Sequence, residues 1–450
     1  MTKHSLTGKK ILFANFPADG HFNPLTGLAV HLKSLGCEVR WYTSSTYTEK
    51  LKKLQIFHYP FKKAVDVSNN DFDKAFPGRV KYKTQIGRLK FDIIHAFILR
   101  GPEYYADIMD IQEEFNFDLL VADCAFTGIP FVKELIKKPI ISIGVLPLSE
   151  NSKDLPPSGL GMEPSYSYFG KIKQVLLRRI TDRFIFRGPN KVMQRLLDKY
   201  RIHHNRVNIF NLLVKKADLL LQSGTPGFEY YRSDLGKNVR FIGSLLPYSS
   251  NKNQPQWFDE RLNQYRKIVL VTQGTVEKDI NKILVPALEA FKCSDTLVVA
   301  TTGGSGTALL KEKYWQQNLI IEDFIPFADV MPYADVYITN GGYGGVLLAI
   351  ENNLPMVTAG MHEGKNEINA RVGYFKYGIN LKTETPKPEQ VRNAVNEVLG
   401  NEMYRHNVEK LALEFGRYNP DALFTRYVEE TINTNKKIIN TAKRKEEKVY

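Results

Sequence analysis

The stretch YITNGGYGGVLLAI, residues 337–350, places four glycines between an apolar run and a helix-like segment. No Lys-Ser or Lys-Thr follows Gly341, Gly342, Gly344 and Gly345, and their spacing differs from the G-x-G-x-x-G of dinucleotide folds. A strand, a glycine loop and a helix in this order still direct backbone N–H groups and a helix N-terminus at an anion. The stretch therefore predicts a loop that binds a phosphorylated ligand.

Similar strand-like apolar runs recur along the chain, and most are followed by a helical pattern. They are ILFANF, EVRWYT, DLLVAD, IISIGV and ADLLLQS in the first half, and IVLVTQ, DTLVVATT, LIIEDFI, DVYITN and PMVTA in the second. Alternation of this kind predicts α/β structure with two doubly wound sheets. With 450 residues, the chain is also too long for a single hydrophobic core.

Domain boundaries follow from the polar, proline-bearing segment between the two series of strands. We expect an N-terminal domain over residues 1–245, a linker over 246–266 and a C-terminal domain over 267–420. Residues 421–450 continue a helical apolar pattern and end in a charged tail.

Composition indicates a globular protein, because 43% of the residues are hydrophobic and 24% are charged. Cys37, Cys124 and Cys293 are odd in number and lack metal-ligand spacing, which indicates neither disulfides nor a zinc site. The N-terminus leads directly into a strand-like run, and no apolar run approaches the length of a membrane span. We expect a cytoplasmic enzyme.

The net charge of +14 is concentrated in residues 170–208, where Lys and Arg alternate with Leu, Ile and Phe. This pattern predicts one or two basic amphipathic helices. Two interpretations stay open: a solvated helix face, or peripheral contact with an anionic membrane. No motif typical of nucleic-acid binding accompanies the charge, so a nucleic-acid partner is not expected.

His21 lies in the loop after the first strand, ahead of a helix that Asn23 and Pro24 are expected to start. The positive end of a helix disfavours a charged imidazole, so we expect a neutral His21 that can act as a general base. Asp123 ends another strand of the same half and can orient the imidazole. The alternatives are a loop histidine bonded to backbone and an ordinary helix cap.

Six segments together resemble the nucleotide-sugar glycosyltransferases that include the UDP-glucuronosyl/glucosyl and macrolide glycosyltransferases. They are ILFANFPADGHFNP, LLVADCAF, GFEYYRSDLGKNVRFIGSLLP, VLVTQGT, FIPFADVMPYADVYITNGGYGG and NLPMVTAGMHEGKNEINARVGYFKYGINL, in this order. The resemblance implies a GT-B fold, in which two Rossmann-like domains face each other across a cleft. It also implies that the N-terminal domain binds the acceptor, that the C-terminal domain binds the donor, and that a C-terminal helix crosses back.

The resemblance further implies a mechanism. His21, flanked by Gly20 and Phe22 in a loop near the acceptor, would deprotonate an acceptor hydroxyl, and Asp123 would orient it. Direct displacement without a metal would invert the anomeric carbon. The expected donor is a nucleoside-diphosphate sugar, with a UDP-sugar favoured and a dTDP-sugar left open, and no bound cofactor is expected. The expected acceptor is an apolar small molecule or lipid.

Donor contacts are implied at positions that match the family's motifs, and several of these positions depart from the usual residue. They are Gly274, Thr275, Phe324, Ile325, Asn340, Gly341, Gly342, Gly344, Gly345, Lys365 and Asn366. Asn340 replaces the family's His at the head of the glycine loop, and Leu348 replaces its ribose-binding Glu. Lys365 and Asn366 replace the Asp-Gln pair that reads the sugar. An ammonium group can only donate hydrogen bonds, so Lys365 would contact the diphosphate, contact an acidic sugar, or pair with Glu363 or Glu367. The remaining alternative is a solvated loop residue.

Two other functions remain possible from the sequence: a nucleotide-sugar epimerase on the same fold, and a binding protein with a decayed donor site. Asp71 and Asp73 form an Asp-x-Asp, the metal pair of a different glycosyltransferase fold, but no strand precedes them. We therefore expect no metal site.

Overall fold

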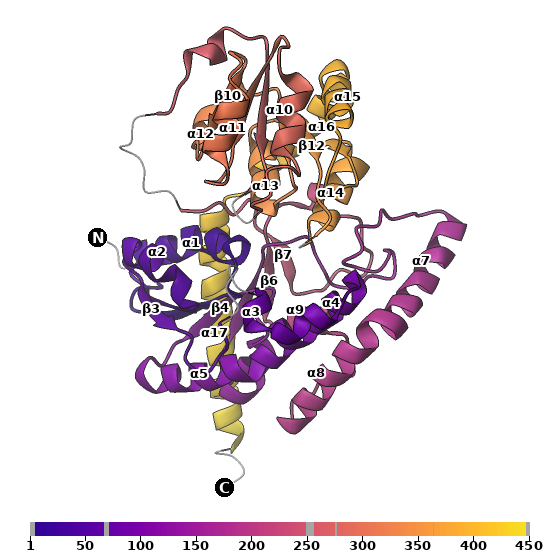
Figure 1. Ribbon diagram of the computed structural model, residues 1–450. Helices are drawn as coiled ribbons and strands as arrows, with labels where there is room; N and C mark the ends of the chain where they lie inside the picture. Colours follow the sequence, from indigo (N-terminus) through magenta and orange to yellow (C-terminus); the bar gives the residue numbers. More distant parts are fainter. Residues whose placement is uncertain (1–4, 67–71, 249–255, 275–276, 363, 447–450) are drawn as a thin grey trace.

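The computed structural model describes residues 5–66, 72–248, 256–274, 277–362 and 364–446. Figure 1 shows two α/β units, one above the other, joined near the middle of the chain. The strands are β1 Lys10–Ala14, β2 Glu38–Thr43, β3 Phe57–Pro60, β4 Leu119–Asp123, β5 Ile140–Gly144, β6 Leu219–Gln222, β7 Val239–Phe241, β8 Lys267–Thr272, β9 Thr296–Thr301, β10 Leu319–Glu322, β11 Val336–Thr339, β12 Met356–Thr358 and β13 Gly378–Asn380.

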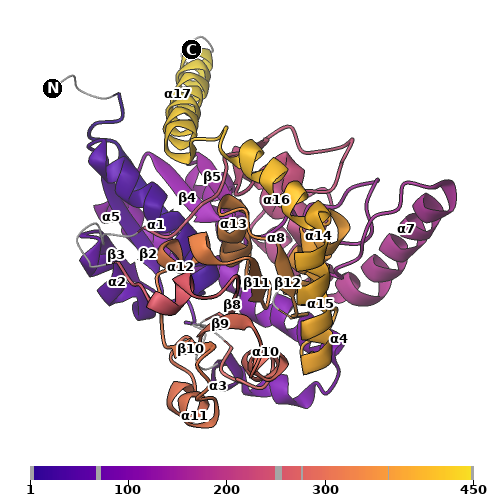
Figure 2. The same ribbon diagram turned by 90° about the horizontal axis from the view of Figure 1, so that it is seen from above.

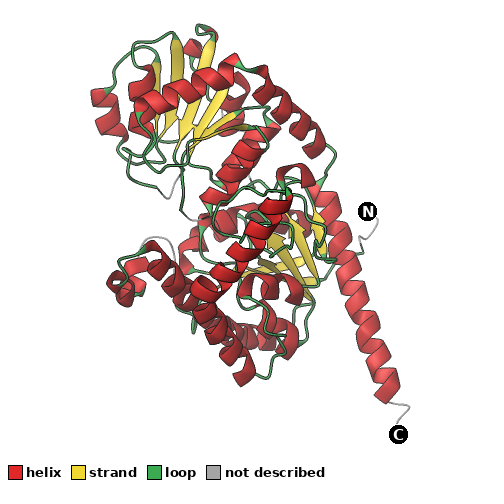
Figure 3. Ribbon diagram, turned by 90° about the vertical axis from the view of Figure 1, so that its right-hand side faces the viewer, coloured by secondary structure: helices red, strands yellow, loops and turns green. Residues whose placement is uncertain are grey.

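Helices connect the strands and flank both sheets (Figure 3). The α-helices are α1 Asp19–Ser34, α2 Thr48–Lys53, α3 Phe72–Ala75, α4 Gln85–Asp92, α5 Gly101–Glu114, α6 Ile129–Phe131, α7 Tyr168–Thr181, α8 Arg187–Lys199, α9 Ile209–Lys216, α10 Leu284–Phe291, α11 Thr307–Lys313, α12 Phe327–Val330, α13 Tyr343–Glu351, α14 Lys365–Tyr374, α15 Pro388–Gly400, α16 Glu402–Phe415 and α17 Pro420–Glu446. Short 3-10 and π-helical segments are η1 Ser45–Tyr47, η2 Pro77–Lys81, η3 Ile93–Phe97, η4 Ile98–Arg100, η5 Val132–Ile136, η6 Asp182–Phe186, η7 Pro226–Phe228, η8 Glu260–Asn263 and η9 Met331–Tyr333.

Both sheets are parallel throughout, which confirms the prediction of two doubly wound domains. In the described residues the first has the strand order β3-β2-β1-β4-β5-β6-β7 and the second β10-β9-β8-β11-β12-β13. All ten apolar runs form strands. The sequence interpretation missed β3, β7 and β13, each of three or four residues at a sheet edge, because such strands lack a continuous apolar run.

Each sheet is covered on both faces by helices. One face of the first sheet packs against α1, and α17 returns from the end of the chain to the same core. The α17 residues in that core are Phe424, Tyr427, Val428 and Ile432. The other face packs against α5, α8 and α9. In the second sheet α13 and α16 cover one face, and α10 and α15 cover the other.

The strand orders create a reversal point in each sheet, between β1 and β4 in the first and between β8 and β11 in the second. In open α/β sheets ligands bind beyond the carboxyl ends of the strands at such a point. The loops that follow β1, β4, β8 and β11 are therefore the places where a functional site is expected.

Candidate active site

His21 and Asp123 meet at the reversal point of the first sheet. β1 leads into α1, which carries His21, and the adjacent strand β4 ends at Asp123. Nδ1 of His21 lies 2.7 Å from Oδ1 of Asp123. The structure therefore brings together the two residues that the sequence analysis placed at strand ends in the same half of the chain.

The Asp123 carboxylate is fully buried and held by several hydrogen bonds. Oδ1 also accepts from the backbone N–H of Ala125 at 2.7 Å, and Oδ2 accepts from that of Phe16 at 2.5 Å. Because a carboxylate can only accept, the shared proton is carried by Nδ1 of His21. Nε2 of a neutral His21 then bears the lone pair that a general base needs.

The start of α1 differs from the prediction. The helix begins at Asp19, so His21 lies in its first turn and not ahead of it. The backbone N–H groups of His21 and Phe22 both donate to the carbonyl of Ala18 at 2.9 Å, which closes the first turn before Pro24 is reached. Pro24 therefore lies inside the helix and does not start it.

Phe22 is not an acceptor-loop residue, which corrects the expectation from the resemblance. It is 1% exposed and its ring stacks on Tyr47 in the core, with 4.2 Å between ring centroids. Gly20 is exposed at the start of α1. The aromatic side chain beside His21 is that of Phe16, edge-on at 5.5 Å and stacked on Phe97 at 4.5 Å. These two phenylalanines form an apolar wall that the sequence interpretation missed.

The glycine loop connects β11 to α13 at the reversal point of the second sheet. Gly341 has a φ of +87°, and a Cβ there would lie 1.9 Å from Oδ1 of Asn369. The buried Asn369 donates through Nδ2 to the carbonyls of Gly360 at 2.9 Å and Asn340 at 3.3 Å. Asn369 thus holds the loop in place through these two hydrogen bonds, and its side chain leaves room only for glycine at position 341. The local sequence around Asn369 carries no signal for this supporting contact.

Asn340 joins the glycine loop to the loop after β8. Its Nδ2 group donates to the carbonyl of Gln273, and its Oδ1 accepts from the N–H of Gly342 at 3.3 Å. Gly274, with a φ of +78°, lies beside the Asn340 amide. Thr275 lies outside the described residues. The two loops predicted to contact phosphate are therefore adjacent.

The N-terminus of α13 has no side-chain cap at Gly342. A Cβ at Gly344 would meet no atom within 4 Å, whereas a Cβ at Gly345 would lie 3.0 Å from the hydroxyl of Tyr337. Gly344 therefore borders open space, and Gly345 faces the protein. Backbone N–H groups in the first turn of a helix can bind an anion in such a position.

Phe324 and Ile325 separate in the structure. Phe324 is 67% exposed, and its ring lies next to Gly304 in the loop after β9. Ile325 is buried in the core of the second domain. An exposed aromatic ring can stack on a nucleobase, whereas the Ile325 side chain is not available for a ligand.

Asn366 contacts the other half of the chain. Its Nδ2 donates to the carbonyl of Gly159 at 3.0 Å. Oε1 of the next residue, Glu367, accepts from the N–H groups of Gly159 and Gly161 at 2.7 and 2.9 Å. The start of α14 therefore holds the loop around residue 160.

Lys365 lies near Glu277, in the segment that follows Gly274. Burial raises the pKa of Glu277, but Lys282 and, more weakly, Lys365 outweigh this effect, so that the pKa is lower than usual. Of the two acids considered as partners of Lys365, Glu367 binds Arg371 at 3.0 Å, and Glu363 lies outside the described residues.

Buried polar contacts fasten the two domains together, and the sequence interpretation missed them. Arg371 is 1% exposed and pairs with the buried Glu229 at 2.8 Å. Burial lowers the pKa of Arg371, but Glu229 and Glu367 outweigh it and raise the pKa above its usual value. The hydroxyl of Tyr343, the first residue of α13, donates to the carbonyl of Ser223 at 2.7 Å. Hydrophobic periodicity carries no signal for such partners.

The Asp-x-Asp motif does not form a metal centre in the described residues. Asp73 pairs with Arg79 at 2.8 Å, and Asp71 lies outside them. Over the described ranges, no group of three or more His, Cys, Asp or Glu side chains is placed to hold a metal ion. None of the described helices is long and apolar enough to cross a membrane.

Comparison with known proteins identifies the family. Residues 162–414 match the family model described as "UDP-glucoronosyl and UDP-glucosyl transferase". The chain is 34% identical over 409 residues to 4'-demethylrebeccamycin synthase of Lentzea aerocolonigenes, which covers 91% of this chain and 96% of that protein. It is 30% identical to UDP-glucosyltransferase 1 of Beauveria bassiana, covering 90% of this chain and 91% of the relative.

Comparison with solved structures agrees with the comparison of sequences. The crystal structure of the glycotransferase of kitacinnamycin aligns with a TM-score of 0.73 at 17% identity, covering 94% of this chain and 99% of that one. The matching family model and the Beauveria bassiana relative are named as transferases, which favours neither the epimerase nor the binding-protein alternative. The chain therefore belongs to the UDP-glucuronosyl and UDP-glucosyl transferase family and is a glycosyltransferase with the GT-B fold.

Proposed function

We propose that the enzyme transfers a sugar from a nucleoside-diphosphate sugar to a hydroxyl group of an apolar small molecule or lipid. A UDP-sugar is favoured over a dTDP-sugar because the chain belongs to a family of UDP-sugar transferases. The observation that carries the proposal is the 2.7 Å contact between His21 and the buried Asp123 at the reversal point of the first sheet. His21 is the general base, and Asp123 is its positioning residue.

The reaction is a direct displacement that needs no metal ion. Nε2 of His21 takes the proton of the acceptor hydroxyl while its oxygen attacks the anomeric carbon of the donor. The bond from that carbon to the diphosphate breaks, and its electron pair leaves with the diphosphate. Attack from the face opposite the leaving group inverts the anomeric configuration. The Asp123 carboxylate stabilises the positive charge that forms on His21.

The donor occupies residues 267–420 in this proposal. The uncapped start of α13 and the loop at Gly274 are available to the diphosphate, and the exposed ring of Phe324 is available to the base. Lys365 lies near the same loops and can add a positive charge that Asn340 does not supply.

The acceptor occupies residues 1–245, with the wall of Phe16 and Phe97 beside His21. An aromatic wall favours an apolar acceptor over a highly polar one. The relative at 34% identity carries the name of a demethylated rebeccamycin, which is consistent with a small-molecule acceptor. Residues 246–266 serve as the linker, and the helix from about residue 421 ties the C-terminus to the acceptor domain.

Two measurements test the proposal together. Thermal shifts with UDP, dTDP, GDP and ADP should show stabilisation by a uracil nucleotide above all others. NMR of the product formed from an α-linked UDP-sugar and an alcohol acceptor, in excess EDTA, should show a β-glycoside. Retention of configuration, loss of turnover in EDTA, or a sugar isomer formed without acceptor would each contradict the proposed reaction.

A further inference from the structure

Helix α7 buries polar side chains and exposes its large apolar ones. Its buried side chains are the polar residues Gln174 and Thr181. Its large apolar side chains are exposed: Phe169 at 80%, Leu176 at 56%, Ile172 at 51% and Ile180 at 44%. Phe184, in the following segment η6, is 64% exposed. Residues at this helical spacing lie along one stripe, which normally faces a protein core.

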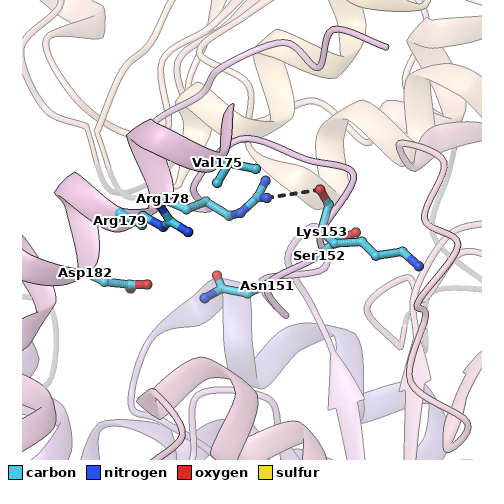
Figure 4. Close-up of a pocket in the computed structure, with 7 residues that line it drawn as sticks. All are labelled: Asn151, Ser152, Lys153, Val175, Arg178, Arg179 and Asp182. Atoms are coloured by element: carbon cyan, nitrogen blue, oxygen red, sulfur yellow. Dashed lines mark hydrogen bonds between the residues drawn. The ribbon is translucent and has the colours of Figure 1, made fainter. Parts of the chain in front are cut away.

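Polar contacts fix the opposite side of α7 to the protein. Oε1 of Gln174 accepts from the N–H of Ser165 at 2.6 Å, and its Nε2 donates to the carbonyl of Asp154 at 3.1 Å. Arg178 donates to the carbonyl of Lys153 at 3.0 Å (Figure 4). A hollow of about 340 Å³ with Asn151 and other mainly polar residues in its wall lies beside this contact. The orientation of α7 is therefore set by hydrogen bonds and leaves the apolar stripe outside.

Exposed cations border the apolar stripe. Lys173 and Arg183 lie on the same outward side of the helix as Phe169 and Leu176. Arg179 lies at the margin of this side, where it also lines the hollow together with Asp182. We name the stripe Phe169, Ile172, Leu176, Ile180 and Phe184, with Lys173, Arg179 and Arg183, the basic apolar face. Figures 1 and 2 place α7 at the margin of the molecule, where this face can reach a large partner.

We infer that the basic apolar face docks on an anionic lipid surface. Apolar side chains at helical spacing with Lys and Arg beside them are the features of a helix that lies in a membrane interface. Each cation near an anionic leaflet adds attraction, and the stems of Lys and Arg can extend toward the headgroups. Contact with lipid would bury the stripe without moving α7.

The same charges disfavour a second copy of the chain as the partner. A symmetric contact through α7 would place Arg179 and Arg183 of one copy against those of the other, and like charges in an interface cost free energy. Nucleic acid would pair with the cations but leave the large apolar side chains in water. The lipid surface satisfies both kinds of residue. The inference does not depend on the roles of His21 and Asp123.

Sedimentation with vesicles tests the inference on the full chain. We expect binding to vesicles of phosphatidylcholine and phosphatidylglycerol at low salt, weaker binding in about 0.5 M salt, and little binding to phosphatidylcholine alone. Phe169→Gln with Leu176→Gln should weaken binding to the anionic vesicles about tenfold. Arg179→Glu with Arg183→Glu should weaken it about thirtyfold.

Leu413→Gln with Arg417→Glu provides a matched control, since Leu413 is 71% exposed on α16 and Arg417 is exposed just beyond the end of this helix. This pair should bind vesicles as the wild type does, and all variants should keep wild-type unfolding temperatures. Equal binding of wild type and the α7 variants would overturn the inference. So would a dimer in the absence of lipid that Leu176→Gln dissociates, because the stripe would then join two copies.

Discussion

The two reversal points have the same topology but opposite chemistry. At the first reversal point, between β1 and β4, the side chains of His21 and Asp123 form a short hydrogen bond, and Asp123 is fully buried. At the second reversal point, between β8 and β11, the chain presents glycines and the amide of Asn340, which joins the two loops. The first reversal point can hold and move a proton, whereas the second offers a ligand mainly backbone groups.

The difference shows which requirement each partial reaction places on a protein. A general base needs a titratable side chain in a fixed tautomer, so another side chain must hold it. A diphosphate needs several N–H donors at close range, and any Cβ between them and the ligand increases the distance. Parallel sheets supply the common location, and the residues placed after each strand decide its chemistry.

Removal of the proposed base should distinguish the functions of the two reversal points most clearly. We expect His21→Ala to lower kcat with an alcohol acceptor by about 10² to 10⁴, since a general base contributes that much, while UDP affinity in calorimetry stays at the wild-type value. Asp123→Asn should lower kcat in the same direction and alter its pH profile without changing the donor KM. His203→Ala, an exposed histidine, is the control. Wild-type turnover of His21→Ala would show that the first reversal point does not supply the base.

The comparison also requires that the domains stay docked, which depends on the buried ion pair. Glu229→Gln removes one of the two carboxylates that compensate Arg371 and leaves Glu367 in place. We expect a loss of about 2 kcal/mol in the free energy of unfolding measured in urea, because a buried hydrogen bond between charged groups is lost. Glu163→Gln breaks the exposed pair with Lys382 and should change stability by less than about 0.5 kcal/mol. Equal losses for both variants would contradict a structural role for the buried pair.

Lys365→Asp tests whether the second reversal point also uses a side-chain charge to bind the diphosphate. If Lys365 meets the diphosphate, the change should weaken UDP binding by on the order of 1 to 3 kcal/mol, as measured by calorimetry. Lys410→Asp on the exposed side of α16 is the control for the change in net charge. Unchanged UDP affinity in Lys365→Asp would leave backbone groups as the diphosphate contacts of the second reversal point and would sharpen its contrast with the first.

Gly344→Ala should give the smallest effect on stability and the most specific effect on binding. The position is helical and open, so alanine should stabilise the fold by about 0.5 to 1 kcal/mol. The added methyl group should nevertheless weaken UDP binding, because it occupies space that the proposed diphosphate needs. Gly400→Ala, also at an open helical position, should stabilise without changing UDP binding. Unchanged UDP affinity in Gly344→Ala would place the diphosphate elsewhere.

Several features could be predicted from the sequence because they depend on local pattern. The ten strands that were predicted are largely buried on both faces, so each appears as a continuous apolar run. His21 and Asp123 were predicted to lie together because each follows such a run in the same half of the chain. The glycines at 341 and 344 stood out because a strand precedes them and a helix follows.

Other features depended on contacts between distant segments. Phe22 was assigned to a loop because the helix was expected to start at Asn23, and a start at Asp19 turns its side chain into the core. The resemblance placed Asn366 at the donor site and carried no sign that Gly159 lies within reach of its amide. Side-chain direction follows from where a helix begins and from what lies opposite, and neither is written in local composition.

The sequence by itself determined the two parallel sheets, the strand ends that carry the site and the basic character of residues 170–208. Only the tertiary structure decided that Asn369 supports the glycine loop, that Arg371 pairs with Glu229, and that α7 presents its apolar side to solvent. The physical reason is the range of the interactions. Apolar periodicity is set within one element, whereas a buried hydrogen bond or ion pair requires two segments that only the folded chain brings together.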